Sequence, residues 1–279
     1  MVEEAPGHPE VLRVRAPNPG PMTLSGTNTY VVGREPAWVI DPGPAMTEHV
    51  ERVRKVAEAR GGIGGVVLTH SHSDHSAAVA MLGAGLAWGE ASGIDETAAL
   101  GEALVVGERG AASAEQAAGW QRAASSEQPA EVGPFRVLAT PGHAIDHVAF
   151  VLGDVCFCGD LILGEGSSIV PPAAGGGSLA DYMRSLERVA ALDPALLCPG
   201  HGPWITDPAA RIEKYASHRR ERERLLVEAL EAGGRSQDEL LDAAWADVPE
   251  PMRPAAALAM RAHLEKLEAE GRVPSDFER

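Results

Sequence analysis

The chain has 279 residues, 44% of them hydrophobic, which is enough for one large domain and a small appendage. Its 24 basic and 40 acidic residues give a net charge of -16, which excludes long-range attraction to polyphosphate or to an anionic membrane. The acidic, proline-containing start is unlike a signal peptide, and no run of about eighteen apolar residues could span a membrane, so we expect a cytoplasmic protein.

The first sixty residues predict short antiparallel strands followed by a helix. Apolar segments separated by Pro and Gly turns predict strands at residues 11–14, 30–33 and 37–40. Asp41 ends the last of these strands, where it either forms the turn or orients a metal-binding histidine. Residues 47–60 have helical apolar spacing and stop at Gly61-Gly62, which predicts an amphipathic surface helix.

Residues 69–76 read T-H-S-H-S-D-H-S and follow the apolar triplet Val66-Val67-Leu68, which predicts a buried strand. Three imidazoles and a carboxylate within six positions are typical of a zinc site. The candidate ligands are His70, His72, Asp74 and His75. The alternative is that these polar residues cap a helix starting near Ser76, but capping uses one side-chain oxygen and leaves the imidazoles unexplained.

The remainder of the first 207 residues predicts further strands and helices around a long irregular stretch. Strands are expected at residues 86–88, 135–139, 148–152, 155–158 and 196–198, and helices at 77–82, 95–104 and 178–190, the last capped by Ser178. Residues 91–131 have weak periodicity, as is common for a loop over a pocket. Cys156, Cys158 and Cys198 suit neither a disulfide framework nor a four-thiolate zinc site, so we interpret them as core residues in a reducing compartment.

Three more candidate ligands lie just past the ends of apolar strands. They are His143 in T-P-G-H, Asp160 in C-G-D and His201 in P-G-H-G. Strand ends of layered α/β proteins converge on one rim, so we expect these groups to meet the first cluster, although each alone could be a turn residue or a cap. His147 begins a strand, where it either binds a substrate oxygen or is structural.

These side chains suffice for two metal ions and a shared water molecule. We assign His70, His72 and His143 to the first ion and Asp74, His75 and His201 to the second. Asp160 would bridge them, because two nearby cations repel each other and an anion between them offsets that repulsion. A water shared by the ions would become hydroxide near neutral pH and attack an ester, thioester, amide or phosphodiester, while Asp74 orients it and passes its proton to the leaving group.

The last seventy residues predict a small helical domain, which places the domain limits at 1–207 and 208–279. Helices are expected at residues 208–231, 236–244 and 254–270, followed by a short strand at Val273. Residues 209–279 hold 12 basic and 15 acidic groups, a net of -3, which gives no excess positive charge for duplex DNA. The arginines at 219, 220, 222 and 224 alternate with Glu221 and Glu223, so we interpret them as a solvated helix face.

The motif H-x-H-x-D-H at residues 70–75, together with His143, Asp160 and His201, resembles the metallo-β-lactamase fold superfamily over about residues 10–206. The resemblance implies a four-layer αββα sandwich with two zinc ions in a cleft at the rim. The sequence leaves open whether iron or manganese replaces zinc in the cell. Four further segments resemble the group containing the mitochondrial lactamase-like endoribonuclease, which has a C-terminal winged helix. They are residues 25–30, 140–147, 159–164 and Asp181-Tyr182-Met183.

The function expected from these patterns is a binuclear zinc-dependent hydrolase. The acidic charge favours a small acyl or thioester substrate, whereas the resemblance implies single-stranded RNA. A noncatalytic regulator that senses metal and binds DNA through the winged helix is an alternative from another class. A β-lactamase is less favoured, because no export signal would bring the enzyme to cell-wall antibiotics. The sequence does not indicate an oligomeric state.

Overall fold

The computed structural model describes residues 2–83, 130–234, 236–275 and 277. The expected strand at 86–88 and helix at 95–104 lie outside the described residues. The chain forms two compact units. The first unit consists of Met1–Ala139, Asp146–Gly166 and Pro194–Asp207, and the second of Thr140–Ile145, Ser167–Asp193 and Pro208–Arg279.

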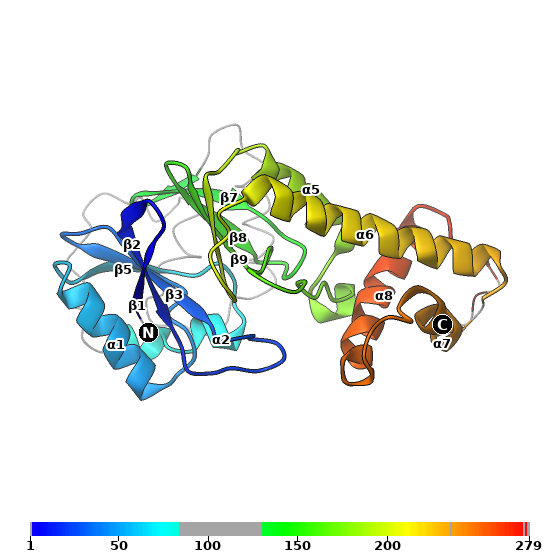
Figure 1. Cartoon of the computed structure of the whole chain (residues 1–279), viewed down its shortest axis with the longest axis horizontal. Helices are drawn as coiled ribbons and strands as arrows, with labels where there is room; N and C mark the ends of the chain where they lie inside the picture. The colour runs from blue at the N-terminus through cyan, green and yellow to red at the C-terminus, as the bar shows by residue number, and fades with distance from the viewer. Residues whose placement is uncertain (1, 84–129, 235, 276, 278–279) are drawn as a thin grey trace, which may run out of the picture. The chain divides into compact units, whose positions relative to one another are not determined.

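Two five-stranded sheets form the centre of the first unit (Figure 1). The first sheet has the order β1 (Val2–Ala5), β2 (His8–Arg15), β3 (Asn28–Val32), β4 (Ala37–Ile40) and β5 (Ile63–Val67). The second has the order β10 (Leu196–Pro199), β9 (Val155–Gly159), β8 (Val148–Leu152), β7 (Phe135–Ala139) and β6 (Ala130–Val132). Among the strands of the described residues, only the β4–β5 and β9–β10 pairs are parallel. β4 and β5 therefore end at one edge of their sheet, as do β9 and β10 of theirs.

Apolar side chains from both sheets form the core between them. Tyr30 of β3 packs edge-on against Phe157 of β9 with ring centroids 5.3 Å apart, and Phe135 and Phe150 fill the same layer. The outer face of the first sheet is covered by α1 (Thr47–Glu58) and α3 (Val79–Gly83). Each fully buried large apolar side chain contributes about 1.5–3 kcal/mol, so this double-sided burial fixes the positions of the strand ends.

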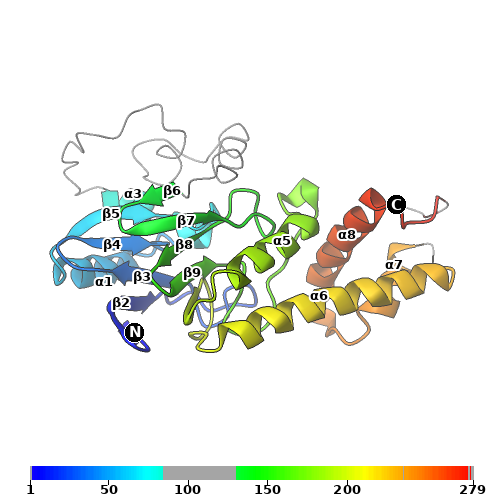
Figure 2. The same ribbon diagram turned by 90° about the horizontal axis from the view of Figure 1, so that it is seen from above.

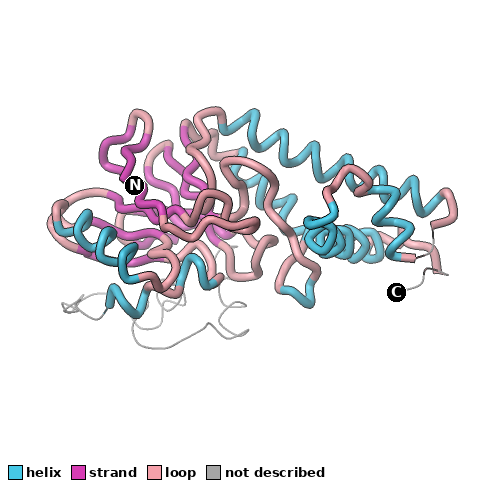
Figure 3. Tube along the Cα trace, turned by 60° about the horizontal axis from the view of Figure 1, so that its bottom comes forward, coloured by secondary structure: helices cyan, strands magenta, loops and turns pink. Residues whose placement is uncertain are grey.

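The second unit is mainly helical, as the cyan segments of Figure 3 show. Its helices are α5 (Leu179–Ala190), α6 (Pro208–Glu231), α7 (Gln237–Ala244) and α8 (Arg253–Ala269), with 3-10 turns at Ala173–Gly175 and Glu250–Met252. α7 and α8 lie against the C-terminal half of α6 (Figure 2) around a core that includes Leu226, Leu240, Trp245 and Leu267. Ser178 accepts a hydrogen bond from Asp181 N at the start of α5, and Ser236 begins α7 in a capping box.

The expected mixed α/β architecture is found, with two packed sheets followed by a C-terminal helical part. The expected strand at Val273 is wrong, because that residue lies in a bend and packs its side chain on the helical core. The edge strands β1 and β6 were not expected from the sequence. Among the described residues, no helix is long and apolar enough to cross a membrane.

Candidate metal centre

Four polar side chains meet where β5, β9 and β10 of the first unit end. The short helix α2 (Ser73–Ser76) follows β5 and presents Asp74 and His75, whereas Asp160 and His201 directly follow β9 and the turn after β10. His201 Nε2 lies 3.2 Å from an oxygen of Asp74 and 3.2 Å from one of Asp160. His75 Nε2 lies 3.4 and 3.6 Å from the same two oxygens and 3.3 Å from His201 Nε2. The structure therefore brings together four predicted ligands.

His70 and His72 form a neighbouring pair in the same loop. His70 Nε2 lies 2.9 Å from His72 Nδ1; His70 is buried, whereas His72 is exposed. Ligand atoms of His70, His75 and Asp160 also lie within 4.8 Å of one another. Asp160 thus lies within reach of both histidine groups, as a bridging carboxylate would.

His143, the remaining predicted ligand, belongs to the second unit. Its Nδ1 lies 2.8 Å from the carbonyl oxygen of Ile169 and 3.2 Å from the hydroxyl of Ser168. Because a carbonyl only accepts hydrogen bonds, Nδ1 carries the proton and Nε2 keeps its lone pair. This is the tautomer that a ligand coordinating through Nε2 requires.

The charges around the rim are those of a site for cations. Burial lowers the pKa of His201, but Asp160 and Asp74 outweigh this and raise it to about 9. Burial likewise lowers the pKa of His75, whereas Asp160 and Asp41 raise it well above 6.5. Burial raises the pKa of Asp160, but His75 and His201 bring it well below its usual value, so the carboxylate is ionised at neutral pH. A cluster that attracts protons so strongly offers the same lone pairs to a metal cation.

Asp41 holds His75 directly and His70 through Thr69, which favours the second interpretation of this residue. Its φ is 50°, in the left-handed region, and its carboxylate accepts hydrogen bonds from Thr69 N and Thr69 Oγ1, both at 2.7 Å. His75 Nδ1 donates to Asp41 at 2.9 Å, and His70 Nδ1 lies 3.0 Å from Thr69 Oγ1. Both histidines thereby keep Nε2 for a cation.

Residues of β2 and β3 hold the loop that carries His201. Asn28 Nδ2 donates to the carbonyl oxygens of Pro199 and Gly202, and Tyr30 Oη donates to Pro199 O at 2.7 Å. Arg13, which is 4% exposed, donates to Gly202 O at 3.0 Å. At Gly200 a Cβ would lie 2.2 Å from Asp160 Oδ1, so only glycine lets the loop approach the rim.

Asp74 is oriented by Thr27, which precedes Asn28 and forms a β-bridge with His201. Thr27 Oγ1 donates to Asp74 Oδ2 at 3.3 Å, and Asn18 holds Thr27 through Nδ2 at 3.0 Å and through Oδ1, which accepts from Thr27 N at 2.9 Å. No role was expected from the sequence for Thr27, Asn18, Asn28 or Arg13. Each of them is a polar residue in or near an apolar segment. Such a residue indicates a buried hydrogen bond only when the neighbouring segments of the fold are known.

His147 lies behind the rim. Its side chain is 1% exposed and its ring centroid is 5.1 Å from that of His70, while the next residue, Val148, donates its N–H to Thr69 O at 2.8 Å. This burial favours the structural alternative over contact with substrate. The three cysteines are buried free thiols, as expected for core residues.

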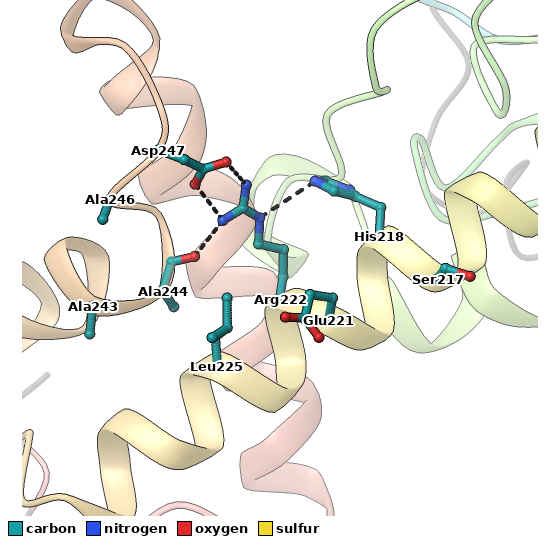
Figure 4. A pocket seen from close by; sticks show the side chains of 9 residues that line it. All are labelled: Ser217, His218, Glu221, Arg222, Leu225, Ala243, Ala244, Ala246 and Asp247. Atoms are coloured by element: carbon teal, nitrogen blue, oxygen red, sulfur yellow. Dashed lines mark hydrogen bonds and ion pairs between the residues drawn. The ribbon is translucent and has the colours of Figure 1, made fainter.

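A concavity of about 570 Å³ lies in the second unit between α6 and α7 (Figure 4). Arg222 at its centre makes two 2.7 Å contacts with Asp247 and donates to Ala244 O at 2.6 Å. His218 lies 3.4 Å from Arg222 Nε. These polar groups bind each other and form no ligand cluster, so we assign the functional site to the rim.

Clustered histidines and carboxylates at the ends of two packed sheets define a protein of the metal-dependent hydrolase class. The profile described as "Metallo-beta-lactamase superfamily" matches residues 22–201, and "Beta-lactamase associated winged helix domain" matches residues 236–278. The chain therefore belongs to the metallo-beta-lactamase superfamily, whose members are generally metal-dependent hydrolases.

Relatives matched over most of their length support this assignment. The chain is 31% identical over 275 residues to "Beta-lactamase-like protein 2 homolog" of Drosophila melanogaster, covering 94% of this chain and 89% of that protein. It is 32% identical over 263 residues to "Lactamase-like protein adaB" of Aspergillus niger, covering 88% of this chain and 76% of that protein.

Two solved structures share the fold. A metallo-beta-lactamase family protein of Thermus thermophilus superposes with a TM-score of 0.67 at 24% identity and 94% coverage of both chains. A beta-lactamase domain protein of Burkholderia ambifaria gives a TM-score of 0.72 at 20% identity, covering 97% of this chain and 88% of that one. At these identities the likeness concerns the fold alone.

Proposed function

We propose that the chain is a binuclear zinc-dependent hydrolase that cleaves an ester-like, thioester or phosphodiester bond. The observation that carries the proposal is the convergence of Asp74, His75, Asp160 and His201 with ligand atoms 3.2–3.6 Å apart. Such a nitrogen and oxygen donor set suits zinc, and iron or manganese accept the same donors. Divalent ions held there would polarise the scissile bond and lower the pKa of a water molecule.

The proposed ligand sets are those expected from the sequence. His70, His72 and His143 would hold one ion, Asp74, His75 and His201 the other, and Asp160 both. The segment with His143 is tethered to the first unit on both sides, because β7 ends at Ala139 and Asp146 returns to that unit.

The side chains of the rim have separate roles in this proposal. Asp41 and Thr69 orient His70 and His75, and Asp74 orients the attacking water and carries its proton to the leaving group. The hydrogen bond from Thr27 limits the rotation of the Asp74 carboxylate and directs one of its oxygens. The limits 1–207 and 208–279 remain our proposal for the catalytic and winged-helix-like domains, supported by the matches at 22–201 and 236–278.

A small acyl or thioester substrate is the partner that the charge favours, since the net charge of -16 repels polyanions. Single-stranded RNA remains the alternative substrate. A DNA-binding regulator is less supported, because Arg222 pairs with Asp247 and Arg224 with Glu221 and Glu228. Duplex DNA and membranes are therefore not proposed as partners, and a cytoplasmic location stays a prediction from the sequence.

The test is a substrate panel with the zinc-loaded full-length protein, metal analysis by mass spectrometry, and His75→Ala as inactive control. Acyl-thioesters and single-stranded RNA are tested beside nitrocefin, and turnover of the thioester alone is the expected result. Absence of turnover on all three, or a chain that binds no transition metal, would contradict the hydrolase. Tight duplex DNA binding with a steep salt dependence, unchanged in His72→Ala, would instead support the regulator.

A further inference from the structure

Arg219 of α6 is a buried cation, contrary to the solvated helix face expected for the arginines at 219, 220, 222 and 224. Its side chain is 4% exposed, whereas Arg220 on the next position is exposed. No carboxylate among the described residues pairs with Arg219. Burying an unpaired charge destabilises a fold unless its donors are used, so the contacts of this guanidinium show what it does.

The guanidinium of Arg219 touches the two segments that hold the His143 loop. Its Nη2 donates to the carbonyl oxygen of Ser168, and its Cζ lies 5.2 Å from the centroid of the Tyr182 ring, within the range of a cation–π contact. Ser168 and the adjacent Ile169 are the residues that contact His143 Nδ1. One arginine thus fixes the backbone whose carbonyl selects the tautomer of His143.

Tyr182 holds the other side of the same loop. Gly142, which precedes His143, has a φ of 138°, and a Cβ there would lie 2.4 Å from the Cα of Tyr182. Gly142 O accepts a hydrogen bond from Ser178 N at 2.9 Å, and Ser185 Oγ donates to Pro141 O at 2.7 Å. The loop is therefore packed on α5, and Arg219 contacts both this support and the segment at Ser168.

We propose that Arg219 is a positioning residue of the metal centre, through which α6 of the C-terminal part fixes the tautomer and direction of His143. The inference rests on the proposed function, in which His143 binds the first ion. All of its contacts lie within the second unit, so they make α6 part of the support of a ligand. Substitution of a residue that orients a metal ligand typically weakens metal binding 10- to 100-fold. We expect the first ion to bind about tenfold more weakly without Arg219.

The experiment compares Arg219→Met with Arg220→Met in the full-length chain. Both substitutions remove one guanidinium from α6, but Arg220 is exposed and lies 3.5 Å from a carboxylate oxygen of Glu213. Zinc titrations at buffered free metal concentration should show two ions in the wild type and in Arg220→Met. In Arg219→Met one of the two should bind about tenfold more weakly, with Arg219→Lys intermediate because it keeps the charge. Equal affinities in Arg219→Met and Arg220→Met would overturn the proposal.

A second measurement does not depend on the stability of any variant. In the metal-free wild type with 15N-labelled histidines, the nitrogen shifts of His143 should show a proton on Nδ1, and Arg219→Met should give a mixture of tautomers. A proton on Nε2 in the wild type would overturn the proposal even if Arg219→Met does not fold. The variant His143→Ala distinguishes the failure of the proposed function from the failure of this inference. If His143→Ala still binds two zinc ions tightly, both the proposed ligand set and the role of Arg219 are wrong. If His143→Ala weakens zinc binding and Arg219→Met does not, only the role of Arg219 is wrong.

Discussion

The histidines of the rim and two histidines of the C-terminal helices, His218 and His263, lie in opposite electrostatic surroundings. At the rim of the first unit, burial lowers the pKa of His201, but Asp160 and Asp74 raise it to about 9. In the second unit, burial and the cation Arg219 lower the pKa of His263 to about 3, and burial with Arg219 and Arg222 lowers that of His218 to about 4. Carboxylates thus make the rim receptive to cations, whereas burial and nearby cations keep His218 and His263 neutral. A buried histidine indicates a metal site only when anions surround it.

The first effect that sharpens this comparison is the pH dependence of zinc binding. Because the pKa of His201 is about 9 and that of His75 is well above 6.5, zinc must displace a proton from each below those values. Below pH 9 the proton on His201 alone should lower zinc affinity about tenfold per pH unit, or roughly 100-fold from pH 8 to pH 6, and the proton on His75 should add to this fall below its own raised pKa. Calorimetry in buffers of different ionisation enthalpy should detect about two released protons per chain at pH 7. If no protons are released, the neighbouring carboxylates do not keep these two rings protonated at pH 7.

A second effect is expected when the anionic centre of the rim is removed. Asp160→Asn keeps the shape of the side chain but removes the charge that faces His75 and His201, so hydrolytic activity should fall at least about 1,000-fold, or about 4 kcal/mol. Steady-state kinetics on whichever substrate is turned over would measure it. Asp154→Asn, an exposed carboxylate in the turn before β9, is the control and should keep full activity. Equal activity of the two variants would contradict a role for Asp160.

The helical unit should respond to acid through His263. Its pKa is depressed from 6.5 to about 3, so the stability tied to its neutral form is complete above pH 6.5 and is lost as the pH falls toward 3. His263→Leu removes this dependence. Between pH 7 and pH 4, its free energy of unfolding should therefore fall less than that of the wild type, by on the order of 3 kcal/mol. Urea unfolding of the metal-free protein at both pH values measures the difference, with His8→Leu as control. If wild type and His263→Leu lose the same free energy of unfolding between pH 7 and pH 4, His263 is not the cause of the acid sensitivity.

The smallest effect concerns the residue that orients the rim histidines. Asp41→Asn keeps one oxygen for Thr69 but weakens the acceptor that fixes His75 Nδ1, so zinc affinity should fall about 10- to 100-fold, less than after loss of a ligand. Isothermal titration with zinc at pH 8 would measure it. Asp193→Asn, another left-handed aspartate, controls for the turn conformation and should bind zinc normally. If Asp41→Asn also binds normally, the carboxylate serves the turn alone.

Local patterns were enough to predict the regular elements and the ligand motif. Helix α6 at Pro208–Glu231 and strands β4, β7 and β8 coincide with their expected ranges, because alternation, helical spacing and caps are encoded within a few residues. The motif at residues 70–75 located four of the rim's side chains for the same reason.

Which polar side chains are buried and hydrogen-bonded depends on contacts between segments that are far apart in the sequence. Arg13 donates to Gly202 across 189 positions, and Arg219 reaches Ser168 across 51, so no local pattern distinguishes these buried arginines from solvated ones. Val273 lacks a strand partner within the described residues, although its own sequence suits a strand. Burial and hydrogen bonding depend on partners remote in sequence, and these long-range contacts set the charge around each histidine.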